Sequence, residues 1–260
     1  MKKYNLSKDF SNYSQRNNEV VPNSSCGPTN MIQALEYAGW EWDNSIFPEL
    51  KQPEDKLTKF TRTNKDVLAY YESHYGPMYR NWLAEAKRLA KEQQKKEIWQ
   101  VDCKDSYAPN EVHDVMSYAV NLFIGYSVKE LAKLPRRPVT RFYNEFDEAD
   151  VVNSLVRGKP VVSSVNFNNC GHYVTIVGFE AEDSFDENVA KGAMGSPAEA
   201  KANCSYIKKY IIDNTYGKFD FVNKKYIAVS GNDEEIERSK FLSIVKPVTH
   251  YFSKGAATCC

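Results

Sequence analysis

The sequence has no excess of charge of either sign. Its 34 Lys and Arg residues balance 34 Asp and Glu residues, so the formal net charge is zero. A chain without a basic excess lacks the electrostatic footprint of a nucleic-acid-binding protein. It also contains no apolar run that approaches the roughly 18 residues a membrane-spanning helix requires. We therefore expect neither a nucleic-acid partner nor a membrane span.

Closely spaced cysteine pairs of the CxxC type are also missing. The six cysteines contain no CxxC pair and lie at Cys26, Cys103, Cys170, Cys204, Cys259 and Cys260. This spacing excludes a zinc framework and a small disulfide scaffold. A single Cys-x-His at 170–172 is too little for a metal site. We expect no metal and no cofactor, while one or two disulfides among residues 103, 170, 204 and the tail remain open.

A secretory signal is absent from the sequence as written. Its first six residues begin with a basic pair, Lys2 and Lys3, but no apolar core follows them. If a signal peptide had been removed, the protein would be secreted or belong to the cell envelope, and otherwise it would be cytoplasmic. The sequence decides neither the compartment nor the oligomeric state.

The spacing of apolar residues changes near the middle of the chain. Apolar spacing predicts helices in the first half and strands mainly in the second, which indicates an α+β fold with two lobes. We expect one domain over 1–260, with a helical lobe over about 1–135 and a β lobe over about 136–255. The expected helices are 26–38, 77–98, 112–123, 127–134 and 147–157. The expected strands are 139–143, 160–165, 172–180, 206–213 and 241–248. We expect the segment 181–204 to be an exposed loop.

Residues 40–110 form a long segment within the helical lobe. We expect an irregular stretch from 40 through Leu57, followed by the charged helix over 77–98. The segment is either a lid or specificity element over a site, or a structural elaboration of the lobe.

Cys26 stands at the start of a predicted helix. Pro28 suits the first turn, since the first helical N–H groups have no partner within the helix. Met31, Ala34 and Leu35 lie on one apolar face, and Gly39 supplies a stop. The positive end of the helix dipole favours a thiolate, which makes Cys26 a candidate nucleophile. The alternative is a buried structural cysteine.

A thiol nucleophile needs a base, an orienting group for that base, and donors for the oxyanion that forms. His172 begins a predicted strand, and Asp213 and Asn214 end the next one. If these strands are antiparallel neighbours, residue 213 or 214 comes within reach of His172 and fixes its tautomer. Gln15 lies upstream of Cys26 and has an amide that could bind the oxyanion together with the Cys26 N–H.

The order of these motifs resembles that of papain-fold cysteine peptidases, and in particular the bacterial branch related to bacteriocin-leader-processing (double-glycine type) peptidases. The resemblance rests on Gln15 followed by Ser25-Cys26-Gly27-Pro28-Thr29-Asn30-Met31, on Gly158-Lys159-Pro160-Val161-Val162, on Gly171-His172-Tyr173-Val174-Thr175-Ile176-Val177-Gly178-Phe179, and on Asp213-Asn214 followed by Gly217. These motifs cover about a fifth of the chain.

The resemblance implies a papain-like fold with a helical lobe carrying the cysteine and an antiparallel β lobe carrying the histidine. It implies that Cys26 is the nucleophile, His172 the general base and later acid, and Gln15 an oxyanion donor. Because an acid is usual in this branch, it favours Asp213 as the orienting residue over Asn214. No transporter domain accompanies these motifs, so export-coupled leader cleavage is not implied.

The implied activity is hydrolysis of peptide or amide bonds through a thioacyl-enzyme on Cys26, with a peptide or protein as substrate. Two alternatives remain. An acyl or amide transferase, or an amidase, would use the same Cys-His-Asp site with another acceptor or donor. A non-catalytic papain-fold module would bind without turnover, although no residue of the expected site is missing.

Overall fold

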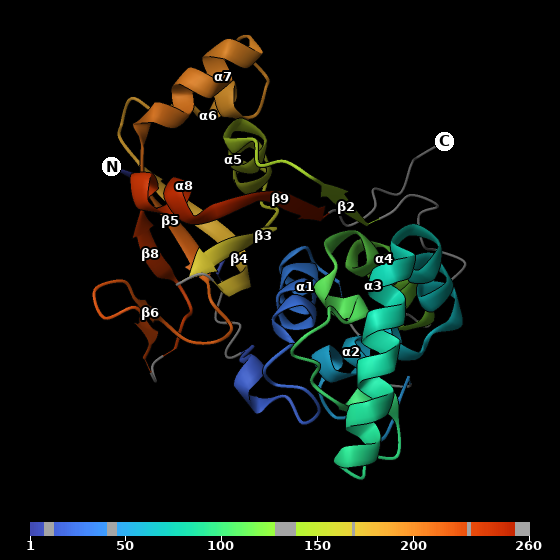
Figure 1. The fold of residues 1–260 in the computed structure, drawn as a ribbon. Helices are drawn as coiled ribbons and strands as arrows, with labels where there is room; N and C mark the ends of the chain where they lie inside the picture. Colours follow the sequence, from blue (N-terminus) through green and yellow to red (C-terminus); the bar gives the residue numbers. More distant parts are fainter. Residues whose placement is uncertain (8–12, 41–45, 128–138, 168–169, 228–229, 253–260) are drawn as a thin grey trace, which may run out of the picture. The chain divides into compact units, whose positions relative to one another are not determined.

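The computed structural model describes residues 1–7, 13–40, 46–127, 139–167, 170–227 and 230–252 (Figure 1). These residues form helices and an antiparallel sheet, which confirms the α+β class. The chain divides into two compact units. The β unit contains residues 1–13, 33–40 and 141–254, and the helical unit contains 14–32 and 41–140. None of the described helices is long and apolar enough to cross a membrane.

Within its described part, the β unit contains a seven-stranded sheet of order β2-β9-β3-β4-β5-β8, with β1 paired to β4. Strands β3, β4, β5 and β8 pair antiparallel along this order. A separate ribbon consists of β6 (Phe219–Asp220) and β7 (Lys225–Tyr226). The strands of the main sheet are β1 (Lys2–Asn5), β2 (Thr140–Tyr143), β3 (Val161–Phe167), β4 (Cys170–Ala181), β5 (Ile207–Asp213), β8 (Glu234–Glu237) and β9 (Val245–Phe252).

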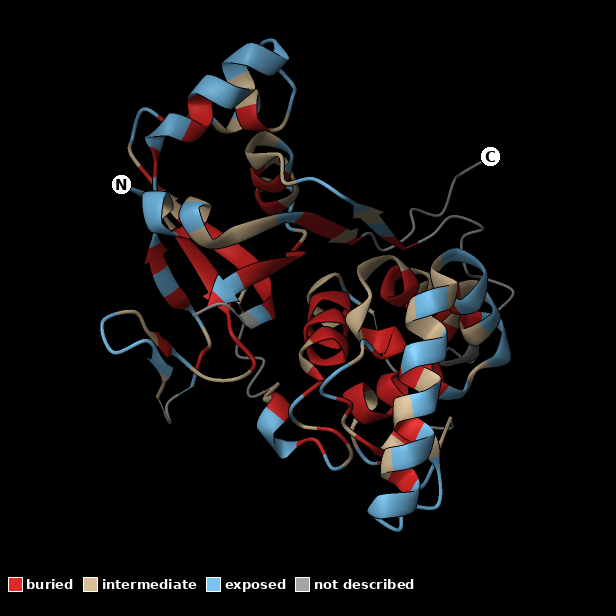
Figure 2. Cartoon of the chain, in the orientation of Figure 1, coloured by how far each residue is buried: buried red, intermediate tan, exposed pale blue. Residues whose placement is uncertain are grey.

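The middle of this sheet is buried on both faces, as the red central strands of Figure 2 show. Side chains of β3, β4 and β5 form one core with those of the helices α5 (Glu148–Val156) and α8 (Arg238–Ile244). Gly178 allows β1 to approach β4, because a Cβ there would lie 2.0 Å from the carbonyl oxygen of Tyr4. The expected strands at 139–143, 160–165, 172–180 and 206–213 and the helix at 147–157 are confirmed.

Two expectations for the β unit were wrong. The segment 181–204 contains two helices, α6 (Glu187–Ala190) and α7 (Pro197–Asn203), rather than only loop. Asp186 caps the first, and Ser196 caps the second in a capping box with Glu199. The expected strand 241–248 is helical up to Ile244, because α8 turns Phe241 into the core before β9 begins.

The helical unit surrounds its own apolar core. Its long helices are α2 (Pro53–Thr63), α3 (Lys65–Glu92) and α4 (His113–Ser127), with short 3-10 turns η1 (Gln15–Asn17), η2 (Ile98–Gln100) and η3 (Pro109–Glu111). Helix α1 (Cys26–Tyr37) belongs to both units, which divide it after Ile32. It ends as expected at Gly39, whose φ is 90° and whose N–H donates to the carbonyl of Glu36.

The segment 40–110 contains more helix than the sequence indicated. Helix α2 replaces part of the expected irregular stretch; Pro53 in its first turn and the acids after it were the missed start signals. The expected helix 77–98 is the second part of α3, which begins twelve residues earlier at Lys65 and kinks at Tyr75, just before Pro77. The predicted helix 112–123 is confirmed as α4, whereas nearly all of the one at 127–134 lies outside the described residues.

A buried arginine joins this segment to the chain that precedes Cys26. Arg62 of α2 is 1% exposed and donates to the carbonyls of Trp99 and Val101 at 3.1 and 2.8 Å. The same guanidinium donates to the Ser24 hydroxyl at 3.0 Å and to the Asn110 side chain at 2.7 Å. These contacts favour a structural role for the segment 40–110.

We expect Arg62→Met to lower the free energy of unfolding by about 3 kcal/mol or more, because it leaves four buried acceptors without their donor. Chemical denaturation measures this change. Arg88→Met is the matched control, since Arg88 is 55% exposed and pairs with Glu92 one turn away. Equal losses in the two variants would show that the buried network contributes no more than a surface ion pair.

Candidate active site

Cys26 is the first residue of α1, and its backbone is held in place by side chains of the helical unit. Its carbonyl accepts a hydrogen bond from the Asn30 side chain at 2.8 Å. One residue earlier, the Ser25 hydroxyl accepts from the Asn18 amide at 2.6 Å, and the Ser25 carbonyl accepts from the Thr29 hydroxyl at 2.8 Å. Cys26 itself is half-buried and not in a disulfide. The helix N-terminus therefore presents a thiol that is in no disulfide, on a well-braced backbone.

The other two described thiols, Cys103 and Cys204, are also free, so they form neither of the disulfides left open by the sequence. Both are buried, and burial raises the pKa of Cys103 to about 11 and that of Cys204 to about 12. These two thiols are therefore protonated at neutral pH.

Gln15 lies in η1 of the helical unit and is buried. Its Nε2 donates to the carbonyl of Pro22 at 3.0 Å, which folds the chain ahead of Cys26 back onto η1. The predicted oxyanion role of Gln15 remains a prediction.

His172 lies near the start of β4 in the β unit and is 6% exposed. As expected, β4 and β5 are antiparallel neighbours, with Thr175 opposite Asp213. The His172 Nε2 makes a hydrogen bond of 2.9 Å with the Asn214 Oδ1. The rings of Phe167, Tyr216 and Tyr226 surround the imidazole, with centroids 5.9 to 6.4 Å away.

The orientation of the Asn214 amide determines the tautomer of His172. The Tyr216 N–H donates to Oδ1 of Asn214 at 3.2 Å, and Nδ2 of Asn214 donates to a Glu234 carboxylate oxygen at 3.3 Å. Both contacts place Oδ1 toward His172, so the proton of a neutral ring resides on Nε2. The Nδ1 atom then carries a lone pair and can accept a proton.

Asp213, which the resemblance favoured as the orienting residue, has other partners. Its carboxylate accepts from the Gln33 amide at 2.9 Å, from the Tyr37 hydroxyl at 2.7 Å and from the Asp233 N–H at 2.8 Å. Burial raises its pKa to about 6. Consecutive residues of an extended chain point in opposite directions, so 213 and 214 cannot both face His172. The residue that the structure places in hydrogen-bond contact with His172 is the alternative, Asn214, and the orienting role of either residue stays a prediction.

Burial also sets the charge of the imidazole. It lowers the pKa of His172 from 6.5 to about 4, while the hydrogen bond with Asn214 acts in the opposite direction. Without an anion beside it, the ring is consequently neutral at physiological pH, which is the form that accepts a proton.

Sequence reasoning missed Glu234, Gln33 and Tyr37. Glu234 is the first residue of the run Glu-Glu-Ile-Glu, a pattern typical of an exposed acidic strand. The structure pairs Glu234 of β8 with Ile212 of β5, and this register shows which glutamate of the run is buried. The two α1 side chains carry no local signal for an interaction 180 and 176 residues away.

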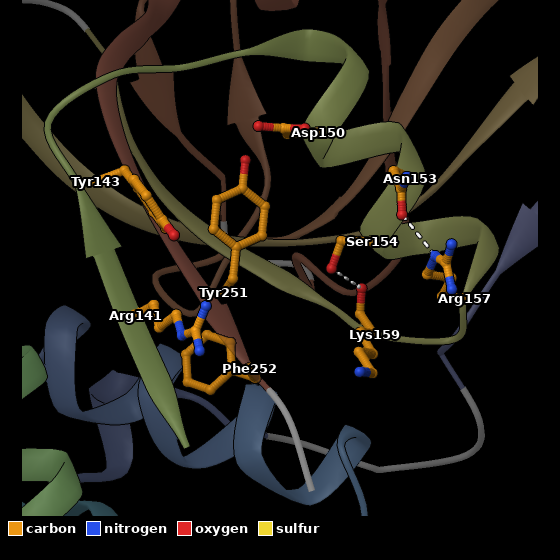
Figure 3. A pocket seen from close by; sticks show the side chains of 9 residues that line it. All are labelled: Arg141, Tyr143, Asp150, Asn153, Ser154, Arg157, Lys159, Tyr251 and Phe252. Carbon is orange, nitrogen blue, oxygen red and sulfur yellow. Dashed lines mark hydrogen bonds between the residues drawn. The ribbon is translucent and has the colours of Figure 1, made fainter. Parts of the chain in front are cut away.

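A cavity of about 450 Å³ lies elsewhere in the β unit, between α5, β2 and β9 (Figure 3). Arg141, Lys159 and Asp150 supply charge to its wall, and Tyr143 and Tyr251 supply rings. No residue of the predicted site lines it. In the part of the chain that the structure describes, no cluster of three or more His, Cys, Asp or Glu side chains could hold a metal ion.

We expect the His172 ring of a Cys26→Ala variant to stay neutral as the pH falls and to take up a proton only near about pH 4, because burial penalises the imidazolium. An NMR titration of the ring measures the midpoint, and a Cys26→Ala, His172→Gln variant assigns the signal. A midpoint between about 6 and 7, the ordinary range of histidine, would contradict this environment.

We expect Gly231→Ala to displace Asn214, since a Cβ at 231 would lie 2.1 Å from the Asn214 carbonyl oxygen and 2.9 Å from its Cβ. The predicted result is a loss of about 1–3 kcal/mol in unfolding free energy and a shift of the His172 ring signals. Gly171→Ala is the control, because its Cβ would meet only the tip of the Lys246 side chain. Unchanged ring signals in Gly231→Ala would contradict the predicted displacement.

Comparison with protein families matches residues 7–208 of the chain to the model described as Peptidase_C39 like family. The matched range includes Gln15, Cys26 and His172, and ends before Asp213. Comparisons with curated proteins and with solved structures give no match. The match confirms the resemblance to papain-fold cysteine peptidases related to the bacteriocin-processing branch. The chain belongs to the Peptidase C39 like family.

Proposed function

We propose that this protein is a cysteine peptidase that hydrolyses peptide bonds through a thioacyl-enzyme on Cys26. The family suggests a cysteine peptidase at the general level. The observation that carries the specific proposal is the hydrogen bond between Asn214 and His172, because it leaves Nδ1 of a neutral imidazole available as a base. Cys26 is the proposed nucleophile because it opens α1 and lies in one of the motifs on which the resemblance rests.

In the proposed reaction, His172 Nδ1 takes the proton of the Cys26 thiol. The thiolate attacks the peptide carbonyl carbon, and the carbonyl π electrons move to oxygen to give an oxyanion. The Cys26 N–H and the Gln15 amide are the proposed donors to this oxyanion, each worth about 3 kcal/mol in the transition state. The intermediate collapses as the C–N bond breaks, and the imidazolium gives its proton to the leaving amine.

Deacylation repeats these steps with water as the nucleophile. His172 Nδ1 takes a proton from water, the hydroxide adds to the thioester carbonyl, and the C–S bond breaks to release the acid and the Cys26 thiol. Asn214 keeps the ring in the same tautomer throughout, since its Oδ1 accepts from Nε2–H in both the neutral and the charged ring.

Asp213 has a different proposed role. It accepts hydrogen bonds from Gln33 and Tyr37 of α1 and so fastens the second half of that helix to β5. Its replacement should therefore affect stability more than the tautomer of His172.

The alternatives use the same residues, so only products separate them. A transferase or amidase would form the same thioester but would prefer an added amine or a small amide donor. A binding module would retain peptides and release no new termini. Mass spectrometry of casein peptides, with and without added amine, distinguishes the three.

We expect iodoacetamide at pH about 6, just below the ordinary histidine pKa, to modify Cys26 and to abolish peptide hydrolysis in proportion. The reason is that a thiolate paired with an imidazolium persists at a pH where isolated thiols are protonated. Peptide mapping by mass spectrometry locates the label while a fluorogenic peptide reports the activity.

Cys103 and Cys204 are the internal controls of this labelling experiment, because their thiols are buried and should remain unlabelled. His172→Gln should slow the labelling of Cys26 without exposing the other two. If Cys26 reacts no faster than these thiols, or if its rate is unchanged in His172→Gln, the mechanism is wrong.

A further inference from the structure

Glu234 is a buried carboxylate at the start of β8. It is 5% exposed, whereas the two acids that follow it on the strand, Glu235 and Glu237, point to solvent. A buried carboxylate is costly unless it accepts hydrogen bonds. Glu234 accepts one from the Phe219 N–H at 3.2 Å and one from the Asn214 Nδ2 at 3.3 Å.

Cations do not explain this burial. Among the described residues, no lysine or arginine forms an ion pair with Glu234. Lys218 contributes only a weaker field at longer range. The carboxylate is thus used as a pure acceptor, and one of its two donors is the amide that contacts His172.

We propose that Glu234 is a positioning residue that holds the Asn214 amide in one orientation and thereby keeps the proton of His172 on Nε2. This inference rests on the proposed function for its catalytic meaning. Its structural content, a chain of contacts from Glu234 through Asn214 to His172, can be tested without any activity.

The donors and acceptors around the Asn214 amide favour one orientation of it. If the Asn214 amide turned over, its Oδ1 would face the Glu234 carboxylate, and two acceptors without a proton would meet. At the other end, Nδ2 would face the Tyr216 N–H, and two donors would meet. The turned amide would also donate to His172 and place the ring proton on Nδ1, where it would block the base. Glu234 and Tyr216 therefore oppose the inactive tautomer from opposite ends of the same amide.

Protonation of Glu234 should weaken this arrangement. A protonated carboxyl has an O–H that can donate to a turned Asn214. Burial raises the pKa of Glu234 to about 7, against the opposing effects of Phe219, Asn214 and Lys218. The flanking acids are engaged elsewhere: Asp213 with α1, and Asp233 with the Asn5 amide. The active tautomer should consequently dominate above about pH 7 and decline below it.

The test is the tautomer of His172, read from ring nitrogen and proton NMR shifts in a Cys26→Ala background between pH 5 and 9, where the ring is neutral. The expected result is a dominant Nε2–H form at high pH and a loss of that form through about pH 7. Glu234→Gln places an amide N–H against Phe219 or Asn214, so it should lower the Nε2–H share and remove the pH step. Glu235→Gln is the matched control and should keep both the share of the Nε2–H form and its pH step.

The titration of the Glu234-containing protein needs no change at position 234, so a Glu234→Gln variant that fails to fold does not prevent the test. A pH-independent Nε2–H form in that protein, or an unchanged profile in folded Glu234→Gln, would overturn the proposal. In peptide hydrolysis, Glu234→Gln should lower kcat by roughly tenfold with little change in KM, since a wrong tautomer impairs the chemical step. If no hydrolysis is found while the tautomer behaves as stated, the proposed function fails and the positioning role stands.

Discussion

The hydrogen bond between His172 and Asn214 is the contact on which the rest of the candidate site depends. An imidazole enclosed by aromatic rings loses its charge, and a neutral imidazole has two tautomers. Only one of these leaves a lone pair on Nδ1. The antiparallel pairing of β4 and β5 places the end of one strand beside the beginning of the other, and so delivers the amide that selects this tautomer.

Several buried polar groups then secure the elements that carry the site. In the helical unit, Arg62 and Asn110 bind Ser24, two residues before Cys26. In the β unit, Asp213 binds the second half of α1. Each of these groups is buried and makes hydrogen bonds with several partners, which gives each of them one stable arrangement. The neighbouring residues 213 and 214 thus divide two tasks, helix attachment and ring orientation.

The sequence predicted the parts of the fold that local patterns control. The Cys-Gly-Pro start of α1, its Gly39 stop and the apolar runs of β3, β4 and β5 are all local signals. The choice between Asp213 and Asn214 could not be read in the same way, because it depends on which side of the strand end faces His172. Glu234 was hidden for a similar reason: a carboxylate in an acidic run is identified as buried only through the register of β8 against β5. Helix α8 was not predicted, because Phe241 and Leu242 are as compatible with a strand as with a helix.

In the proposed mechanism, the Cys26 thiol and the His172 imidazole act as one pair. The most direct measurement is the NMR titration of the His172 ring in the unmodified protein compared with Cys26→Ala. A thiolate beside the ring stabilises the imidazolium, so we expect the ring to hold its proton to a clearly higher pH when Cys26 is present. Identical titration midpoints in the two proteins would contradict the pair.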